Sequence, residues 1–198
     1  MQKGDSSNSF TKLTFSDGVT TIKGKVFGSF RSLKSVTIPS SVSSIDEQAF
    51  VDCTGELFVN CKILTGAFND SDFTKVTIGN SVASIGSEAF YNCDKLESID
   101  IAASVKSIGS WAFYNCGKLE SVTIPADVTS IGLYAFNGCS SLENVYCEPV
   151  NPPTLNLHVF SGNASGRLIH VQSASESAYK TAANWSAYAD VIVGDLDK

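Results

Sequence analysis

Apolar and polar positions alternate along this chain in a pattern that returns every 23 residues. In LESVTIPADVTSIGLYAFNGCSS, residues 119–141, the first apolar positions are Leu119, Val122 and Ile124, and Pro125 follows. Alternating β-branched residues closed by a proline predict a short strand with one face in the core. Each 23-residue unit is therefore expected to begin with a strand.

A second apolar group in the same segment predicts a turn that packs beneath the strand. Val128 and Ile131 come first, and Ala135, Phe136 and Cys139 then follow at the spacing of a single helical turn. A unit this short cannot bury its own apolar side, so neighbouring units must stack. Equivalent side chains would then form ladders about 4.7–4.9 Å apart.

Copies of this unit fill most of the chain, from residue 10 onward. The segment 56–72 is a shortened copy, and the last copy changes after Cys147 into the proline-rich EPVNPPTL, which cannot continue a strand ladder. Full copies occupy residues 10–32, 33–55, 73–95, 96–118 and 119–141. The predicted phenylalanine ladder consists of Phe27, Phe50, Phe68, Phe90, Phe113, Phe136 and Phe160.

The unit LxxVxIPxxVxxIGxxAFxxC resembles the BspA-like class of leucine-rich repeat, known from surface proteins of anaerobic bacteria and some protists. The resemblance covers about residues 10–165 and includes the shortened ELFVNCKI segment. Some coils depart from the unit. Lys23 and Asp46 stand where the unit has glycine, and Gly79 and Ala102 stand where it has proline, which leaves the geometry of those turns open.

The resemblance extends to residues 166–198, which look like the closing segment of that family. A strand at 168–171, a helix around 174–183 and then Trp185 and Tyr188 are expected there. The fold implied is α/β: a right-handed leucine-rich-repeat solenoid of about 23-residue coils with a C-terminal αβ cap. The cap would shield the last coil through Tyr179, Trp185 and Val191. Residues 1–9 are expected to be a disordered tail or a remnant of an expression vector.

Composition and charge narrow the classes of function. Of the 198 residues, 43% are hydrophobic and 17% are charged, so a continuous core is expected. The net charge of −6 and the absence of a basic patch in the sequence argue against nucleic acid as a partner. No apolar stretch is long enough to insert in a membrane, and Met1 to Ser9 does not look like a signal peptide.

The sequence offers little for catalysis or metal binding, so we expect no enzyme activity, no metal and no cofactor. His158 and His170 lie outside the regular repeats without a nucleophile and acid at a recognisable spacing, and are expected at the surface. No CxxC pair and no phosphate-binding glycine motif occurs. The six cysteines are expected to be buried, reduced thiols: Cys53, Cys61, Cys93, Cys116, Cys139 and Cys147.

Two rows of side chains are candidates for binding. Outward positions of the strands form a polar row, which includes Thr77, Asp100, Thr123 and Tyr146. A solvated face remains the alternative, because any half-exposed sheet shows such positions. The aromatic candidates are Tyr91, Trp111, Tyr114, Tyr134 and the outward Phe58. Tryptophan and tyrosine are enriched at binding hot spots, but these side chains could equally cover the turn layer.

The function implied by the resemblance is that of a non-catalytic protein-binding module at the cell surface or in a secreted protein. The expected partner is a protein, either a host extracellular matrix protein such as fibronectin or a protein on other bacterial cells. The alternative is a structural spacer or self-assembly domain without a ligand of its own. The oligomeric state stays open.

Overall fold

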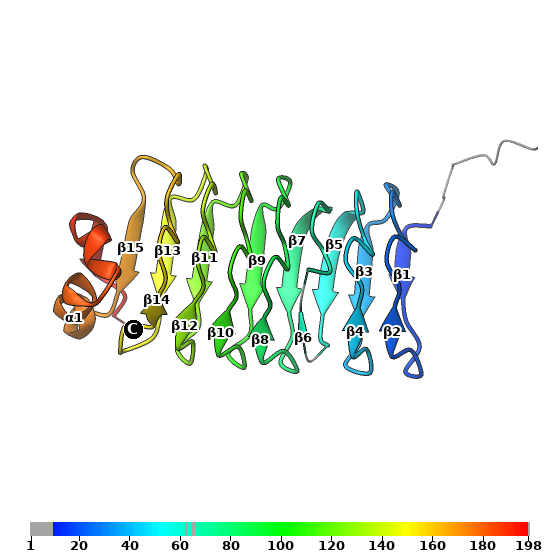
Figure 1. The fold of residues 1–198 in the computed structure, drawn as a ribbon, viewed down its shortest axis with the longest axis horizontal. Helices are drawn as coiled ribbons and strands as arrows, with labels where there is room; N and C mark the ends of the chain where they lie inside the picture. Colours follow the sequence, from blue (N-terminus) through cyan, green and yellow to red (C-terminus); the bar gives the residue numbers. More distant parts are fainter. Residues whose placement is uncertain (1–9, 62, 65, 198) are drawn as a thin grey trace, which may run out of the picture.

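Parallel strands stack into an elongated solenoid of about eight turns (Figure 1). This computed structural model describes residues 10–61, 63–64 and 66–197, so the predicted tail at 1–9 lies outside the described residues. The first row of strands comprises β1 (Lys12–Thr14), β3 (Ser35–Ile38), β5 (Thr54–Val59), β7 (Asp72–Ile78), β9 (Ser98–Ile101), β11 (Ser121–Ile124), β13 (Asn144–Cys147) and β15 (Leu168–Val171). The second row comprises β2 (Thr21–Ile22), β4 (Ser44–Ile45), β6 (Ile63–Leu64), β8 (Ser84–Ile85), β10 (Ser107–Ile108), β12 (Ser130–Ile131) and β14 (Thr154–Leu155).

The register places equivalent residues of successive coils beside one another. Val122 of β11 pairs with Val145 of β13, which pairs with Ile169 of β15. In β11 the burial alternates, with Val122 and Ile124 inside and the two residues between and before them outside. The predicted solenoid with coils of about 23 residues is therefore confirmed.

The phenylalanine ladder forms the centre of the core. Neighbouring rings stack with centroids 5.0–5.8 Å apart and planes within 27° of parallel. The rings from Phe50 to Phe160 are fully buried, whereas Phe27 at the first coil is only partly buried. The ladder therefore runs unbroken through the shortened coil, where Phe50 and Phe68 remain 5.5 Å apart.

The single helical turn predicted to contain each Ala-Phe pair and the cysteine that follows it is wrong, because tight turns occupy this place. In one coil, Trp111 and Asn115 have positive φ angles of 54° and 57°. An α-helix requires negative φ and hydrogen bonds to the fourth preceding residue. The Phe113 N–H instead donates to the Ala135 carbonyl of the next coil at 2.7 Å. Among the described residues, helix is confined to the cap.

Departures from the repeat are accommodated locally. Val82 N–H donates to the Gly79 carbonyl at 3.1 Å, which matches the bond from Val128 to Pro125 at 3.0 Å. The same turn therefore forms with glycine in place of proline. A Cβ at Gly79 would overlap the amide of Asn60, which accepts a hydrogen bond from the Ser81 N–H at 2.9 Å.

The shortened coil interrupts the second row of strands. Strands β2 and β4 form a separate two-stranded sheet, and the row resumes from β6 to β14. In the first row, β5 still pairs with both neighbours, with a register shift between Gly55 and Glu56. The shorter length of this coil is thus accommodated on the side of the second row of strands.

The C-terminal cap follows β15, at the end of the solenoid opposite β1 (Figure 1). It consists of the 3-10 helix η1 (Ser173–Ser175), helix α1 (Glu176–Thr181), the 3-10 helix η2 (Trp185–Val191) and strand β16 (Ile192–Gly194), which pairs with β15. Tyr179 and Trp185 are fully buried, and Val191 is partly buried. The Trp185 ring lies 6.1 Å from the Phe160 ring and so ends the ladder.

The cap is also fixed by hydrogen bonds to the proline-rich loop. The Trp185 Nε1–H donates to the Pro153 carbonyl and the Tyr179 hydroxyl donates to the Pro149 carbonyl, both at 2.7 Å. These buried carbonyls need donors because the loop carries no strand ladder. The αβ cap expected from the sequence is therefore present.

The first coil, by contrast, leaves apolar side chains uncovered among the described residues. Phe10 is 65% exposed and Val26 is 54% exposed. Phe10, Phe27 and Phe30 line a hollow of about 280 Å³ at this end of the solenoid.

None of the described helices is long and apolar enough to cross a membrane.

Candidate binding surface

The predicted polar row runs along the outer face of the first row of strands. Thr77 pairs with Asp100, and Thr123 pairs with Tyr146. Asp100 and Thr123 are exposed, whereas Thr77 and Tyr146 are partly buried. Phe58 lies in the same row, between Thr37 and Thr77, and is 40% exposed. An apolar ring on a polar strand face is thus open to solvent.

His170 extends this row in a way that the sequence did not indicate. Its ring stacks on Tyr146 with centroids 4.7 Å apart, and its side chain is only 12% exposed, contrary to the expected surface position. Nδ1 lies 2.8 Å from an Asp195 oxygen, and Nε2 lies 3.0 Å from the Asn144 side-chain oxygen. Strand pairing of β13 with β15 buries the ring, which sequence spacing alone did not show.

Trp111, Tyr134 and His158 form a row on the second side of the solenoid, here called the aromatic ledge. The Trp111 and Tyr134 rings stack with centroids 6.0 Å apart, and Tyr134 and His158 stack at 5.3 Å. Trp111 and Tyr134 are partly buried and His158 is exposed, as expected for that histidine. Leu157, the residue before His158, is 55% exposed and widens the apolar surface.

His158 could have been recognised as part of this row from its place before Val159-Phe160, the last variant of the Ala-Phe pair. Trp111, Tyr134 and His158 all have positive φ, between 54° and 56°. Bulky residues rarely adopt this left-handed conformation, which costs of order 1–3 kcal/mol for a non-glycine residue. The ledge is therefore built from side chains that the backbone does not favour at these positions.

The predicted pair Tyr91 and Tyr114 lies after the Ala-Phe pair rather than before it. The two rings stack with centroids 5.1 Å apart and planes within 7° of parallel. Both side chains are partly buried. The structure thus brings the aromatic candidates together as two stacked groups, with Phe58 separate on the strand face.

A hollow of about 610 Å³ lies where the second row of strands is interrupted, and we call it the acidic hollow. Ile45, Asp46, Glu47, Gly66, Ser87 and Glu88 line it. It arises because β4 does not pair with β6 and because Gly66 presents no side chain. Sequence reasoning missed this site, since its three carboxylates come from two coils on either side of the shortened one.

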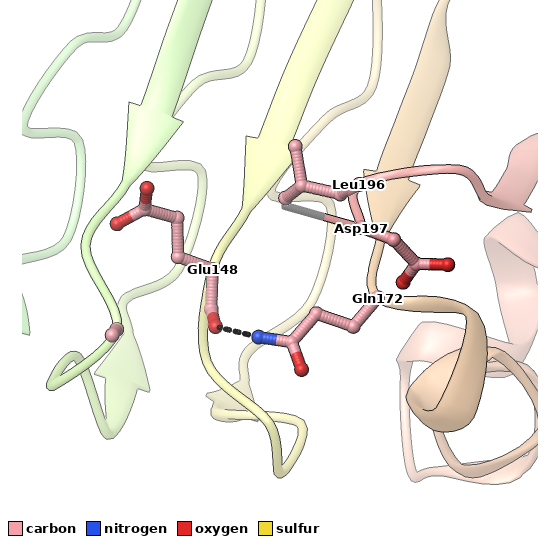
Figure 2. A pocket seen from close by; sticks show the side chains of 5 residues that line it. Glu148, Gln172, Leu196 and Asp197 are labelled. Atoms are coloured by element: carbon pink, nitrogen blue, oxygen red, sulfur yellow. Dashed lines mark hydrogen bonds between the residues drawn. The ribbon is translucent and has the colours of Figure 1, made fainter.

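A second hollow of about 380 Å³ lies between the last coils and the cap (Figure 2). Gln172 crosses it and donates to the Glu148 carbonyl at 3.3 Å. Asp197 accepts hydrogen bonds from the backbone and hydroxyl of Ser173, which hold the pKa of its carboxyl below the usual value. These contacts secure the C-terminal segment against β15, so this hollow is a junction of the cap.

The cysteines are buried, as expected. The thiols of Cys53, Cys93, Cys116 and Cys139 each donate to the carbonyl of the phenylalanine one coil earlier, at 2.8–3.3 Å. Burial raises the pKa of Cys53 to about 11 and that of Cys93 to about 12. The thiolate is the form that reacts, so the raised pKa lowers the reactivity of these thiols.

The residues that the structure describes contain no group of three or more side chains suited to a metal ion.

The parallel coils, the stacked phenylalanines and the closing cap define a leucine-rich-repeat solenoid. The model of the BspA type leucine rich repeat region matches residues 5–60 and 61–185 in six copies. The chain therefore belongs to the BspA-type leucine-rich repeat family, whose domains generally serve as protein-interaction modules.

Solved structures of leucine-rich repeat proteins are similar to this chain. A leucine-rich repeat protein of T. pallidum is 20% identical with a TM-score of 0.52, covering 81% of this chain and 68% of that one. A leucine rich cell surface protein of Faecalibacterium prausnitzii is 19% identical with a TM-score of 0.48, covering 83% of this chain and 64% of that one. At these identities the likeness concerns the fold alone. No curated protein matches the sequence.

Proposed function

We propose that this domain is a non-catalytic binding module that attaches its parent protein to a protein partner at or outside the cell surface. The partner is a host extracellular matrix protein or a protein on other bacterial cells. The observation that carries the proposal is the aromatic ledge, a row of stacked rings that are partly or fully exposed. Large, rigid aromatic side chains supply much of the energy at protein interfaces.

Binding to immobilised matrix proteins and to whole bacterial cells tests this function. The purified protein should bind saturably, and Trp111→Ala should weaken binding about tenfold, the effect of a moderate hot spot. Phe58→Ala tests whether the strand face takes part. Phe10→Ala is a matched control, because it removes an exposed ring at the far end of the solenoid. Equal binding by wild type and Trp111→Ala would remove the ledge from the site.

The open first coil favours a second candidate function, that of a self-assembly or spacer domain. Among the described residues, its apolar side chains are uncovered and β1 and β2 each pair on one side only, and such features can let chains associate. Analytical ultracentrifugation distinguishes the candidates. Under this alternative, the wild type self-associates and Phe10→Ser or Val26→Thr makes it monomeric, whereas Trp111→Ala changes nothing.

A further inference from the structure

The acidic hollow and the aromatic ledge belong to one line of equivalent backbone positions. Gly66, Glu88, Trp111 and Tyr134 each precede an Ala-Phe pair and have positive φ, between 44° and 57°. The N–H of each donates to a carbonyl of the next coil at 2.9–3.2 Å. These hydrogen bonds fix the coils side by side, so the hollow at Gly66 and the rings at Trp111 and Tyr134 form a continuous surface.

The chemistry changes along this line. At the hollow the side chains are carboxylates, and from Trp111 onward they are aromatic or aliphatic. Lys23 lies 3.9 Å from Asp46 and is highly exposed, so it offsets that charge only in part. Neither Glu47 nor Glu88 forms an ion pair with the part of the chain that the structure describes. Within the described part of the chain, the hollow therefore keeps two carboxylates without an ion-pair partner beside an apolar surface.

Resting on the proposed function, we infer that this line binds an extended segment of the partner protein that carries a lysine or arginine followed by an aromatic or large apolar residue. The basic side chain enters the acidic hollow between Glu47 and Glu88. The apolar residue packs on the rings of Trp111 and Tyr134. The carboxylates of the hollow attract the basic side chain, so they favour binding of the segment in this direction over the reverse direction.

The spacing of the two contacts follows from the coil spacing. Successive phenylalanines from Phe68 to Phe136 lie 5.0–5.4 Å apart, so the hollow and Tyr134 are separated by about 16 Å. An extended peptide rises about 3.3 Å per residue. The basic and apolar residues should therefore be about five positions apart, and the segment should lie along the solenoid axis, across the strands.

The backbone positions the side chains of this line in the same way in each coil. Positive φ recurs at the equivalent residues Lys25, Gln48 and Glu88, at 57–59°, so it belongs to the turn and does not single out the rings. The equivalent residue of the shortened coil is a glycine, which opens the floor of the hollow.

Fluorescence anisotropy with three labelled synthetic peptides tests the inference. The first carries two lysines, a three-residue Ser-Gly spacer and then Trp-Leu, the second replaces the lysines with glutamates, and the third replaces Trp-Leu with serines. We expect the first to bind at least tenfold more tightly than the others. Glu47→Gln with Glu88→Gln should weaken its binding about tenfold and reduce its dependence on salt, and Trp111→Ala should weaken it at all salt concentrations.

Glu143→Gln is the matched control, because it removes an exposed glutamate far from the hollow and should leave peptide binding unchanged. Thermal unfolding shows that each variant remains folded. Equal binding of the lysine and glutamate peptides, or no saturable binding of the lysine peptide up to about 1 mM, overturns the inference.

The same variants separate this inference from the proposed function. Partner binding that Trp111→Ala weakens but the double glutamate variant leaves intact would keep the binding module and reject the basic segment. Partner binding that both variants weaken supports the two proposals together. Partner binding that neither variant changes would reject the whole surface.

Discussion

The thiol of Cys139 donates a hydrogen bond of 3.1 Å to the carbonyl oxygen of Phe113, one coil earlier. The same contact joins Cys116 to Phe90 and Cys93 to Phe68. The Phe113 carbonyl also accepts the Cys116 N–H at 3.3 Å, so the thiol is a second donor to it, and cysteine is small and apolar enough to donate inside the core. The recurring cysteine of the repeat is thus a structural donor to the turn that carries the phenylalanine ladder.

This contact predicts how stability depends on pH. Burial raises the pKa of Cys93 from the ordinary 9.0 to about 12, so the unfolded chain loses this proton at a lower pH than the folded protein. The contribution of Cys93 is therefore fully present below pH 9 and is lost as the pH rises from about 9 to 12. In urea unfolding, the free energy of unfolding should fall more steeply with rising pH in wild type than in Cys93→Ala. The two slopes should differ by at most about 1.4 kcal/mol per pH unit. Parallel curves for the two proteins would contradict a buried neutral thiol.

The phenylalanine ladder predicts a large loss of stability for an internal ring. Phe113→Ala removes a fully buried ring that stacks on both Phe90 and Phe136, at 5.3 and 5.0 Å. Lost transfer energy and the remaining cavity should together cost about 3–5 kcal/mol in chemical denaturation. Phe58→Ala, at a ring that is 40% exposed, is the control and should cost clearly less. A loss below about 1 kcal/mol for Phe113→Ala would refute the stacking register.

Two glycines of neighbouring coils should respond oppositely to substitution by alanine. Gly138 has φ of 75°, and a Cβ there would overlap the side-chain oxygen of Asn115. Gly117 has no positive φ, and its Cβ would meet only Ser140 Oγ, at 3.6 Å. Gly138→Ala should therefore destabilise the protein by about 1–3 kcal/mol. Gly117→Ala should be neutral or slightly stabilising, because it restricts the unfolded chain. Thermal melts that rank the two variants the other way would disprove this account of the turn.

The repeat made most of the fold predictable. Because Ala-Phe returns at a fixed interval, the strand register and the ladder through Phe113 follow from stacking identical units. The turn after Phe113 was not predictable from periodicity, since apolar spacing cannot distinguish a helical turn from two turns with positive φ. Asn115 and Gly138 were the available signal, because asparagine and glycine tolerate that conformation.

The binding surface was predictable only in part. Regular spacing identified Trp111 and Tyr134, which lie one unit apart before Ala-Phe. The acidic hollow escaped prediction because it depends on an unpaired strand edge at the shortened coil, where Glu47 and Glu88 come to flank Gly66. Such a feature arises from a break in the repeat, and the lengths of neighbouring coils decide where the second row of strands can pair.

The C-terminal cap yields the last prediction, because its removal uncovers the end of the core. A chain that ends after Gly166 loses β15, which pairs with β13, and Trp185, which covers the ring of Phe160. The exposed strand edge and the uncovered apolar ring should make this truncated protein aggregate, as size-exclusion chromatography with light scattering would show. Trp185→Phe tests the hydrogen bond of Trp185 separately from the packing of its ring on Phe160. This variant keeps an aromatic ring but leaves the Pro153 carbonyl without its donor. We expect this variant to remain soluble and to lose about 1–3 kcal/mol of stability. A truncated protein that stays soluble and unfolds cooperatively would show that the last coil needs no cap.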